Sequence, residues 1–208
     1  MAHDGYISPL STRYASRDMQ YIFSEDFKFR TWRRLWIALA KAENALGLDV
    51  TAEQIAQLEA HKDDINYEEA QAQEKLVRYD VMSHVYAYGL QCPDAAGIIH
   101  LGATSCYVGD NTDIVILREA SRLVLKKCAQ VVKNLSAFAE KYKAMPCLGY
   151  THLQPAQLTT VGKRATLWIY ELSQDVENLE HQLQNLKLLG SKGTTGTQAS
   201  FMELFGGD

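Results

Sequence analysis

The sequence predicts an all-α fold: a small N-terminal helical domain over residues 1–103, then the first part of a long-helix bundle domain, truncated, over residues 104–208. Apolar residues recur at spacings of three and four along most of the chain, which is the period of a helix with one buried face. Capping residues, glycines and prolines separate these stretches where helices begin and end. Two stretches run for about thirty residues each, a length typical of helices in a bundle.

The first strong helical pattern covers residues 27–46. Trp32 and Trp36 lie four residues apart on its apolar face, and we assign both to the core. Gly47 ends the pattern, because glycine readily adopts the left-handed backbone in which many helices stop.

The next two helices are predicted from their caps. Thr51 and Asn66 each stand three residues before a Gln or a Glu, which is the spacing of a capping box. The first begins a short helix that continues to about residue 60. The second begins a longer helix that continues to about residue 88.

Two long helices are predicted in the second half, over residues 111–143 and 160–189. Helices of this length need partners along their whole length, and the small N-terminal domain covers too little of them. Their apolar stripes therefore indicate more helices, from a longer chain or from other subunits. We expect the sequence to be part of a longer chain.

Composition excludes several classes of protein. With 25 acidic and 21 basic residues the net charge is −4, which argues against a general nucleic-acid-binding surface. No apolar run is long enough to span a bilayer, and the N-terminus lacks the pattern of a signal peptide. We therefore expect a cytoplasmic protein without membrane partners. Residues 13–34 carry six basic and three acidic side chains, which form either a solvated helix face or a surface for a small anion.

The four cysteines form no C-x-x-C pair, so neither a zinc site nor a redox motif is indicated. We expect reduced and mostly buried thiols. No cluster of His, Cys, Asp and Glu has the spacing of metal ligands, so no metal is expected.

Three polar stretches interrupt the helical pattern, and loops between rigid helices often carry binding groups. They are residues 100–105, 150–155 and 191–198. In the first, the hydroxyl and backbone N–H groups of Thr104 and Ser105 are suited to hold a carboxylate. A plain helix-entry turn would contain the same residues.

His152 lies in the second stretch, between Thr151 and Gln154, where the surroundings are too polar for a packing histidine. An imidazole there is suited to donate or accept a proton near neutral pH. The alternative is a structural or surface histidine. The third stretch is either a loop that closes over an anion or a flexible connector.

Two further groups are candidates for substrate binding. Arg13 and Tyr14 form a dipeptide suited to a phosphate and a base or sugar, or an ordinary surface pair. Arg78, Tyr79 and Asp80 interrupt a helical pattern with a cation, a phenol and an anion. They are either binding residues or a partly buried polar cluster within one helix.

Taken together, these stretches resemble the adenylosuccinate lyases, of the animal type, in the fumarase/aspartase superfamily. The strings that carry the resemblance are residues 11–16, 29–33, 95–113, 151–164 and 192–201. Within them Thr151 to Gln154 match the T-H-x-Q element of the superfamily. The resemblance implies a fumarase/aspartase-like fold.

The resemblance also implies the chemistry, a β-elimination that releases fumarate from adenylosuccinate to give AMP and from SAICAR to give AICAR in purine biosynthesis. It implies that His152 is the general acid, within a T-H-x-Q element whose Thr151 and Gln154 bind substrate. Thr104 and Ser105 would hold the succinyl part.

The remaining candidates would surround the nucleotide. The resemblance implies that Arg13 and Tyr14 meet its phosphate end, and that Arg78, Tyr79 and Asp80 line the same pocket. It further implies a homotetramer with active sites shared between subunits, and no metal or organic cofactor, because the carboxylate of the substrate is the electron sink.

The chain departs from the family pattern in two places. Tyr79 stands where the family usually has a histidine, so the role of that position is open. The loop that carries the catalytic-base serine, S-S-x-M-P-x-K-x-N-P, does not occur, so these 208 residues alone are expected to be inactive. The alternatives are another fumarate-releasing lyase, such as argininosuccinate lyase, and a non-catalytic helical assembly module.

Overall fold

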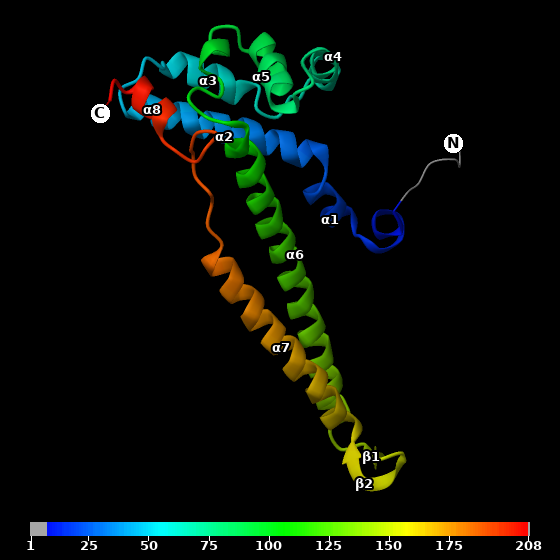
Figure 1. Cartoon of the computed structure of the whole chain (residues 1–208). Coiled ribbons are helices and arrows are strands. Elements are labelled where there is room, and N and C mark those ends of the chain that lie inside the picture. Colours follow the sequence, from blue (N-terminus) through cyan, green and yellow to red (C-terminus); the bar gives the residue numbers. More distant parts are fainter. Residues whose placement is uncertain (1–7, 208) are drawn as a thin grey trace. The chain divides into compact units, whose positions relative to one another are not determined.

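The computed structural model describes residues 8–207 and consists of helices with one short hairpin (Figure 1). Packing divides the chain into two compact units. Unit 1 comprises the residues through Ile116 and those from Leu188 onward, and unit 2 is Leu117–Lys187. The domain boundary between residues 103 and 104 stays a prediction.

Unit 1 is built from helices. They are η1 (Leu10–Tyr14, one turn of π-helix), α1 (Arg17–Ile22), α2 (Glu25–Ala45), α3 (Ala52–Ala60), α4 (Tyr67–Val77), α5 (Asp80–Gln91), η2 (Ala96–Ile98), the beginning of α6 (Ser105–Lys141) and α8 (Ala199–Leu204). Unit 2 holds the rest of α6, the strands β1 (Pro146–Thr151) and β2 (Gln154–Thr160), and α7 (Val161–Asn185). Apart from the hairpin, the all-α prediction is confirmed.

The core of unit 1 forms around α2. Trp32 and Trp36 are each 1% exposed, which confirms their assignment to the core. Their ring centroids lie 6.1 Å apart at an interplanar angle of 68°, an edge-on arrangement that aromatic pairs favour. Leu58 of α3, Tyr88 of α5 and Val108 of α6 belong to the same buried cluster. The segment 27–46 therefore folds as its apolar pattern predicts, and it organises the unit.

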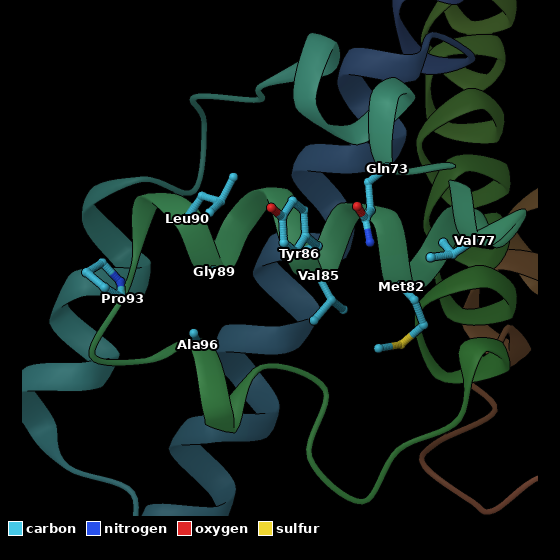
Figure 2. A pocket seen from close by; sticks show the side chains of 9 residues that line it. All are labelled: Gln73, Val77, Met82, Val85, Tyr86, Gly89, Leu90, Pro93 and Ala96. Atoms are coloured by element: carbon cyan, nitrogen blue, oxygen red, sulfur yellow. The ribbon is translucent and has the colours of Figure 1, made fainter. Parts of the chain in front are cut away.

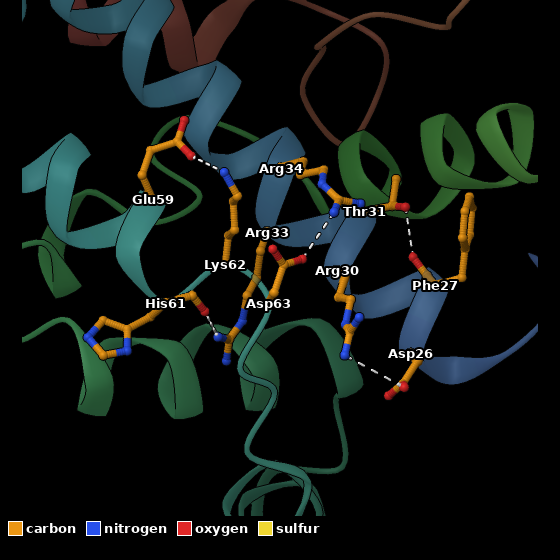
Figure 3. Close-up of polar contacts among 10 residues, drawn as sticks. All are labelled: Asp26, Phe27, Arg30, Thr31, Arg33, Arg34, Glu59, His61, Lys62 and Asp63. Carbon is orange, nitrogen blue, oxygen red and sulfur yellow. Dashed lines mark hydrogen bonds and ion pairs between the residues drawn. The ribbon is translucent and has the colours of Figure 1, made fainter. Parts of the chain in front are cut away.

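Arg33 is a buried charge in this core. Its guanidinium carbon lies 4.1 Å from the centroid of the Tyr88 ring. It donates hydrogen bonds to the carbonyl oxygen of His61 (Figure 3) and, at 2.7 Å each, to the carbonyl oxygen of Asp64 and Oε1 of Gln91. Burial lowers the pKa of Arg33. Arg33 thus joins α2 to the α3–α4 connection and to α5, and it is not part of a solvated basic face.

The neighbouring arginines of α2 are more exposed. Arg34 pairs with Asp63 at 3.0 Å, and Arg30 pairs with Asp26 at 3.8 Å; Figure 3 shows both pairs. Exposed ion pairs of this kind contribute little to stability, about 0–1 kcal/mol. For Arg34 the solvated-face interpretation fits, whereas Arg30 is half-buried.

The capping box before α3 is confirmed. The backbone N–H of Gln54 donates to the Thr51 hydroxyl at 3.2 Å, and the backbone N–H of Thr51 donates to Oε1 of Gln54 at 2.9 Å. The two hydrogen bonds satisfy N–H groups that have no partner within the helix.

The prediction of one helix over residues 66–88 is wrong. The chain leaves the helix at Arg78, whose φ is +53°, and α5 begins two residues later at Asp80. The Asp80 carboxylate accepts a hydrogen bond from the N–H of Val81 at 2.8 Å. The break allows α4 and α5 to pack against each other, so tertiary packing overrides a continuous helical pattern.

The long helices are confirmed with shifted ends. α6 begins at Ser105, six residues before the predicted start, because the helix continues through Gly109. α7 ends at Asn185, four residues before the predicted end. At the start of α7, a Cβ on Gly162 would lie 2.3 Å from the carbonyl oxygen of Ala139. Only glycine permits this close approach of α7 to α6.

Residues 150–155 were predicted as a loop between helices, and the hairpin of β1 and β2 was not predicted. The strands pair antiparallel, with an irregularity between Leu148 and Tyr150. No helix in the described part of the chain is long and apolar enough to cross a membrane.

Candidate functional site

Two of the three polar stretches meet in unit 1. A pocket of about 600 Å³ is lined by residues of 100–105 on one side and of 193–197 on the other. Tyr79 of the α4–α5 break, Met82 of α5, and Ala199, Ser200 and Glu203 of α8 complete its wall. The sequence separates the two stretches by almost ninety residues, so only the fold brings them together.

Gly102 allows the first stretch to lie against α8. Its φ is +66°, and a Cβ at this position would lie 2.6 Å from Cδ1 of Leu204 and 2.9 Å from Cε1 of Phe201. The hydroxyl of Ser200 donates a hydrogen bond to the carbonyl oxygen of Gly102 at 2.7 Å. A side chain at Gly102 would therefore both strain the backbone and displace α8.

Asn111 holds the residues that lead into the stretch 191–198. Its buried side-chain amide donates to the carbonyl oxygens of Tyr107 and Gly190, at 2.7 and 2.9 Å, and accepts from the N–H of Leu189 at 2.8 Å. These hydrogen bonds attach residues 189–190 to the first turns of α6. The signal available in the sequence was a polar residue at an interior position of an apolar helical pattern, and it was not recognised.

His100 is a further pocket residue that was not assigned a role from the sequence. The indole Nε1 of Trp36 donates a hydrogen bond to Nδ1 of His100 at 3.0 Å. Burial lowers the pKa of His100, so the ring is neutral near pH 7. Because an indole N–H can only donate, Nδ1 carries no proton and Nε2 carries it. The pocket is therefore lined by an imidazole with an Nε2–H donor, held at a φ of +65°.

Thr104 and Ser105 line the same pocket at the start of α6. The first turn of this 37-residue helix contains no acidic residue. Its free N–H groups and the partial positive charge of the helix N-terminus favour an anion. Together with two hydroxyls and the His100 donor, the arrangement is suited to a carboxylate.

The three residues of the α4–α5 break lie in different surroundings. Tyr79 lines the pocket with His100 and Thr104. Arg78 lines a separate hollow of about 680 Å³ along α4. Asp80 is the first residue of α5, and its carboxylate accepts a hydrogen bond from the N–H of Val81.

Arg13 and Tyr14 lie in η1, and both side chains are exposed. Neither is among the residues that line the 600 Å³ pocket. Their predicted contact with a phosphate stays a prediction.

His152 lies in unit 2, in the turn between β1 and β2. Thr151 and Gln154 are the last paired residues of the two strands, and all three side chains are exposed. The φ of His152 is +48°. Left-handed backbone at a residue other than glycine costs free energy and is concentrated at functional sites. The described residues outside glycine with positive φ are Arg78, His100, His152 and Leu153.

An apolar pocket of about 620 Å³ lies beside α5 (Figure 2). No charged residue is among those that line it: Gln73, Val77, Met82, Val85, Tyr86, Gly89, Leu90, Pro93 and Ala96. Met82 also lines the 600 Å³ pocket. None of the predicted site residues lies in the apolar pocket.

The cysteines do not form a site. All four are free, and only Cys92 is buried, while Cys106 is exposed. The expectation of mostly buried thiols is therefore wrong. Within residues 8–207 no group of three or more His, Cys, Asp and Glu side chains is arranged to hold a metal ion.

Comparison with known proteins gives consistent matches. A family model described as lyase matches residues 15–202. The adenylosuccinate lyase of Saccharomyces cerevisiae is 53% identical over 99% of this chain and 43% of its own length. The enzyme of the same name from Schistosoma mansoni is 49% identical over 98% of this chain and 42% of its own length. The chain thus spans less than half the length of these curated relatives.

Solved structures share the fold. The 3-carboxy-cis,cis-muconate lactonizing enzyme of Pseudomonas putida superposes with a TM-score of 0.81 at 24% identity, over 93% of this chain and 45% of that one. A fumarate lyase from Mesorhizobium sp. BNC1 superposes with a TM-score of 0.75 at 22% identity, over 92% and 48%. These likenesses confirm the predicted fumarase/aspartase-like fold.

Proposed function

The chain belongs to the lyase family, and from that premise we propose that the natural protein is an adenylosuccinate lyase. The proposed reaction releases fumarate from adenylosuccinate to give AMP, and from SAICAR to give AICAR. The observation that carries the proposal is the 53% identity to the yeast adenylosuccinate lyase over 99% of the chain. The reaction is an elimination across a carbon–nitrogen bond.

The pocket of unit 1 supports a role in binding the succinyl part. When a base removes the proton next to a carboxylate, negative charge develops on that carboxylate. Donors already fixed in place stabilise this charge most effectively. We assign the role to the hydroxyls of Thr104 and Ser105, the first N–H groups of α6, and the Nε2–H of His100. No cofactor takes part in this proposal.

The turn between β1 and β2 in unit 2 is suited to carry the general acid of the reaction. We assign His152 as the group that protonates the leaving nitrogen, with Thr151 and Gln154 beside it as substrate-binding residues. An exposed imidazole at the tip of a hairpin is free to enter a site, and imidazoles as a class donate and accept protons near neutral pH.

The remaining assignments concern the nucleotide. Arg13 and Tyr14 are assigned to the phosphate end of the nucleotide. The exposed phenol of Tyr79 is assigned to a contact with the same nucleotide. Arg78 and Asp80, which do not line the 600 Å³ pocket, are assigned to the same substrate in the assembled active site. An arginine fork is suited to a phosphate because it donates two parallel hydrogen bonds.

We further propose a cytoplasmic homotetramer with shared active sites. Trp168 and Tyr170 of α7 and Phe138 of α6 are exposed large apolar side chains in unit 2. Large apolar side chains left exposed on long helices are typical of a protein that assembles through them. Assembly through these helices would bury it.

Fumarate release from adenylosuccinate by the purified natural protein, followed by NMR, tests the proposal. Fumarate and AMP should appear in equal amounts, and argininosuccinate should give none. Release from argininosuccinate but not from adenylosuccinate would favour the related lyase. No release from either substrate would favour a non-catalytic assembly module.

A further inference from the structure

His152 shares its turn with one other residue. Thr151 pairs with Gln154 across the hairpin, so His152 and Leu153 alone form the loop. Their φ values are +48° and +61°. Positive φ at both central residues is the pattern of a type I′ turn, which strongly prefers Asn-Gly.

Leu153 is the residue that this backbone disfavours. Glycine adopts positive φ at little cost, and asparagine tolerates it through local hydrogen bonds, whereas a leucine side chain clashes with its own backbone. The Leu153 side chain is also fully exposed. The described residues therefore give it no burial to offset the strain.

The segment that contains the turn carries no acidic or basic side chain apart from His152. Residues 145–160 contain no Asp, Glu, Lys or Arg, although 22% of the chain is charged. Four further large apolar side chains are exposed on this segment: Met145, Leu148, Tyr150 and Leu158. Such a composition is typical of a surface from which water is excluded. The turn is therefore suited to a dry environment around His152.

We propose that Leu153 is a positioning residue for His152. In the assembled active site its side chain packs beside the turn, holds the imidazole in the orientation needed for proton transfer, and excludes water from it. The strain in the backbone is the cost of placing two functional side chains on adjacent residues of a two-residue loop. This inference rests on the proposed function, because it gives Leu153 a part in the elimination.

Three substitutions in the natural protein test the inference. Leu153→Gly and Leu153→Asn suit the left-handed backbone but remove the apolar side chain, while Leu153→Met keeps an apolar side chain of similar size. We expect kcat for fumarate release to fall about 10-fold or more in the first two variants, since small errors in orientation cost up to about 10²-fold. KM for adenylosuccinate should stay within about two-fold, because substrate contacts remain. The Met variant should retain most of kcat.

Thermal unfolding distinguishes this role from a structural one. We expect Tm of the Gly and Asn variants to equal or exceed that of the wild-type protein, because strain is relieved. Leu46→Ala is the matched control, since Leu46 is also an exposed leucine, 69% exposed, but has an ordinary φ of −89° at the end of α2. Its kcat should not change.

Two results would overturn the inference. A wild-type kcat in Leu153→Asn would show that the leucine side chain is not needed. A kcat in Leu153→Met as low as that in Leu153→Gly would show that an apolar side chain is not sufficient to position His152. If either result occurs in a protein that releases fumarate, the proposed function stands and the role of Leu153 does not. A wild-type protein that releases no fumarate contradicts both.

Discussion

The indole Nε1 of Trp36 donates a hydrogen bond to Nδ1 of His100 across 64 positions of sequence, at 3.0 Å. This contact couples the core of unit 1 to the wall of the pocket. It leaves the proton of the neutral imidazole on Nε2, so the most buried part of the fold sets the hydrogen-bonding character of a site residue.

Replacing Trp36 with phenylalanine should weaken substrate binding. Trp36→Phe keeps an aromatic ring but removes the donor, so the His100 proton is free to move to Nδ1. We expect KM for adenylosuccinate to rise about 3- to 10-fold, and the free energy of unfolding to fall by about 1 kcal/mol, the typical contribution of one hydrogen bond. Steady-state kinetics and urea unfolding measure the two effects.

Trp32→Phe is the control for that experiment. Trp32 is equally buried, and its Nε1 has no hydrogen-bond partner among the described residues. Its substitution should leave KM unchanged. An equal rise of KM in both variants would mean that packing, and not the tautomer of His100, controls binding.

His152→Ala should lower kcat about 10²-fold or more in the natural protein, which is the contribution of one general acid. The matched control is His181→Ala, because His181 is another exposed histidine of unit 2, on α7. The control should turn over at the wild-type rate. Near-wild-type turnover of the His152 variant would remove it from the mechanism.

Arg33→Met should lower the free energy of unfolding by about 3 kcal/mol. The variant removes the hydrogen bonds that the buried guanidinium donates to the carbonyl oxygens of His61 and Asp64 and to Oε1 of Gln91. Hydrogen bonds of charged groups contribute about 1.5–3 kcal/mol each. Arg34→Met removes an exposed ion pair at 3.0 Å and should cost less than about 1 kcal/mol. Chemical denaturation of the two variants measures the difference, and similar losses would contradict a buried role for Arg33.

Glu43 should make stability depend on pH. It is 2% exposed, and neither carboxylate oxygen has a hydrogen-bond partner among the described residues. Burial raises the pKa of Glu43 to about 7. The folded state therefore holds this proton more tightly than the unfolded chain does. The resulting stability is fully present below the unfolded pKa of about 4.5 and is lost as pH rises through about 7.

Glu43→Gln should therefore raise Tm at pH 8 and have a small effect at pH 5. The free energy of unfolding at pH 8 should rise by at most about 3 kcal/mol, which follows from the difference between the folded and unfolded pKa values of Glu43. Glu59→Gln is a control of opposite sign, because hydrogen bonds from Lys41 and Lys62 lower the pKa of Glu59. If the Tm difference between Glu43→Gln and the wild-type protein did not grow from pH 5 to pH 8, the Glu43 carboxyl group would not be buried in its charged form at pH 8.

Several features follow from the sequence alone, because they depend on residues a few positions apart. The spacing of Trp32 and Trp36 placed both in the core, and Thr51 with Gln54 marked the start of α3. Apolar periodicity predicted α6 and α7, although their ends shifted by as many as six residues. The T-H-x-Q string is enough to make His152 a candidate, since it needs only four adjacent residues.

Other features required contacts that no local pattern encodes. The pocket joins residues 100–105 to residues 193–197, and burial of Arg33 depends on carbonyl oxygens from a different helix connection. The hairpin that carries His152 was not predicted, and the break at Arg78 falls inside a segment whose cap and spacing predicted one helix. Helical period and capping are set by neighbours within one or two turns. The protonated nitrogen of His100 and the strain at Leu153 exist only once distant segments, or two paired strands, have been brought together by packing.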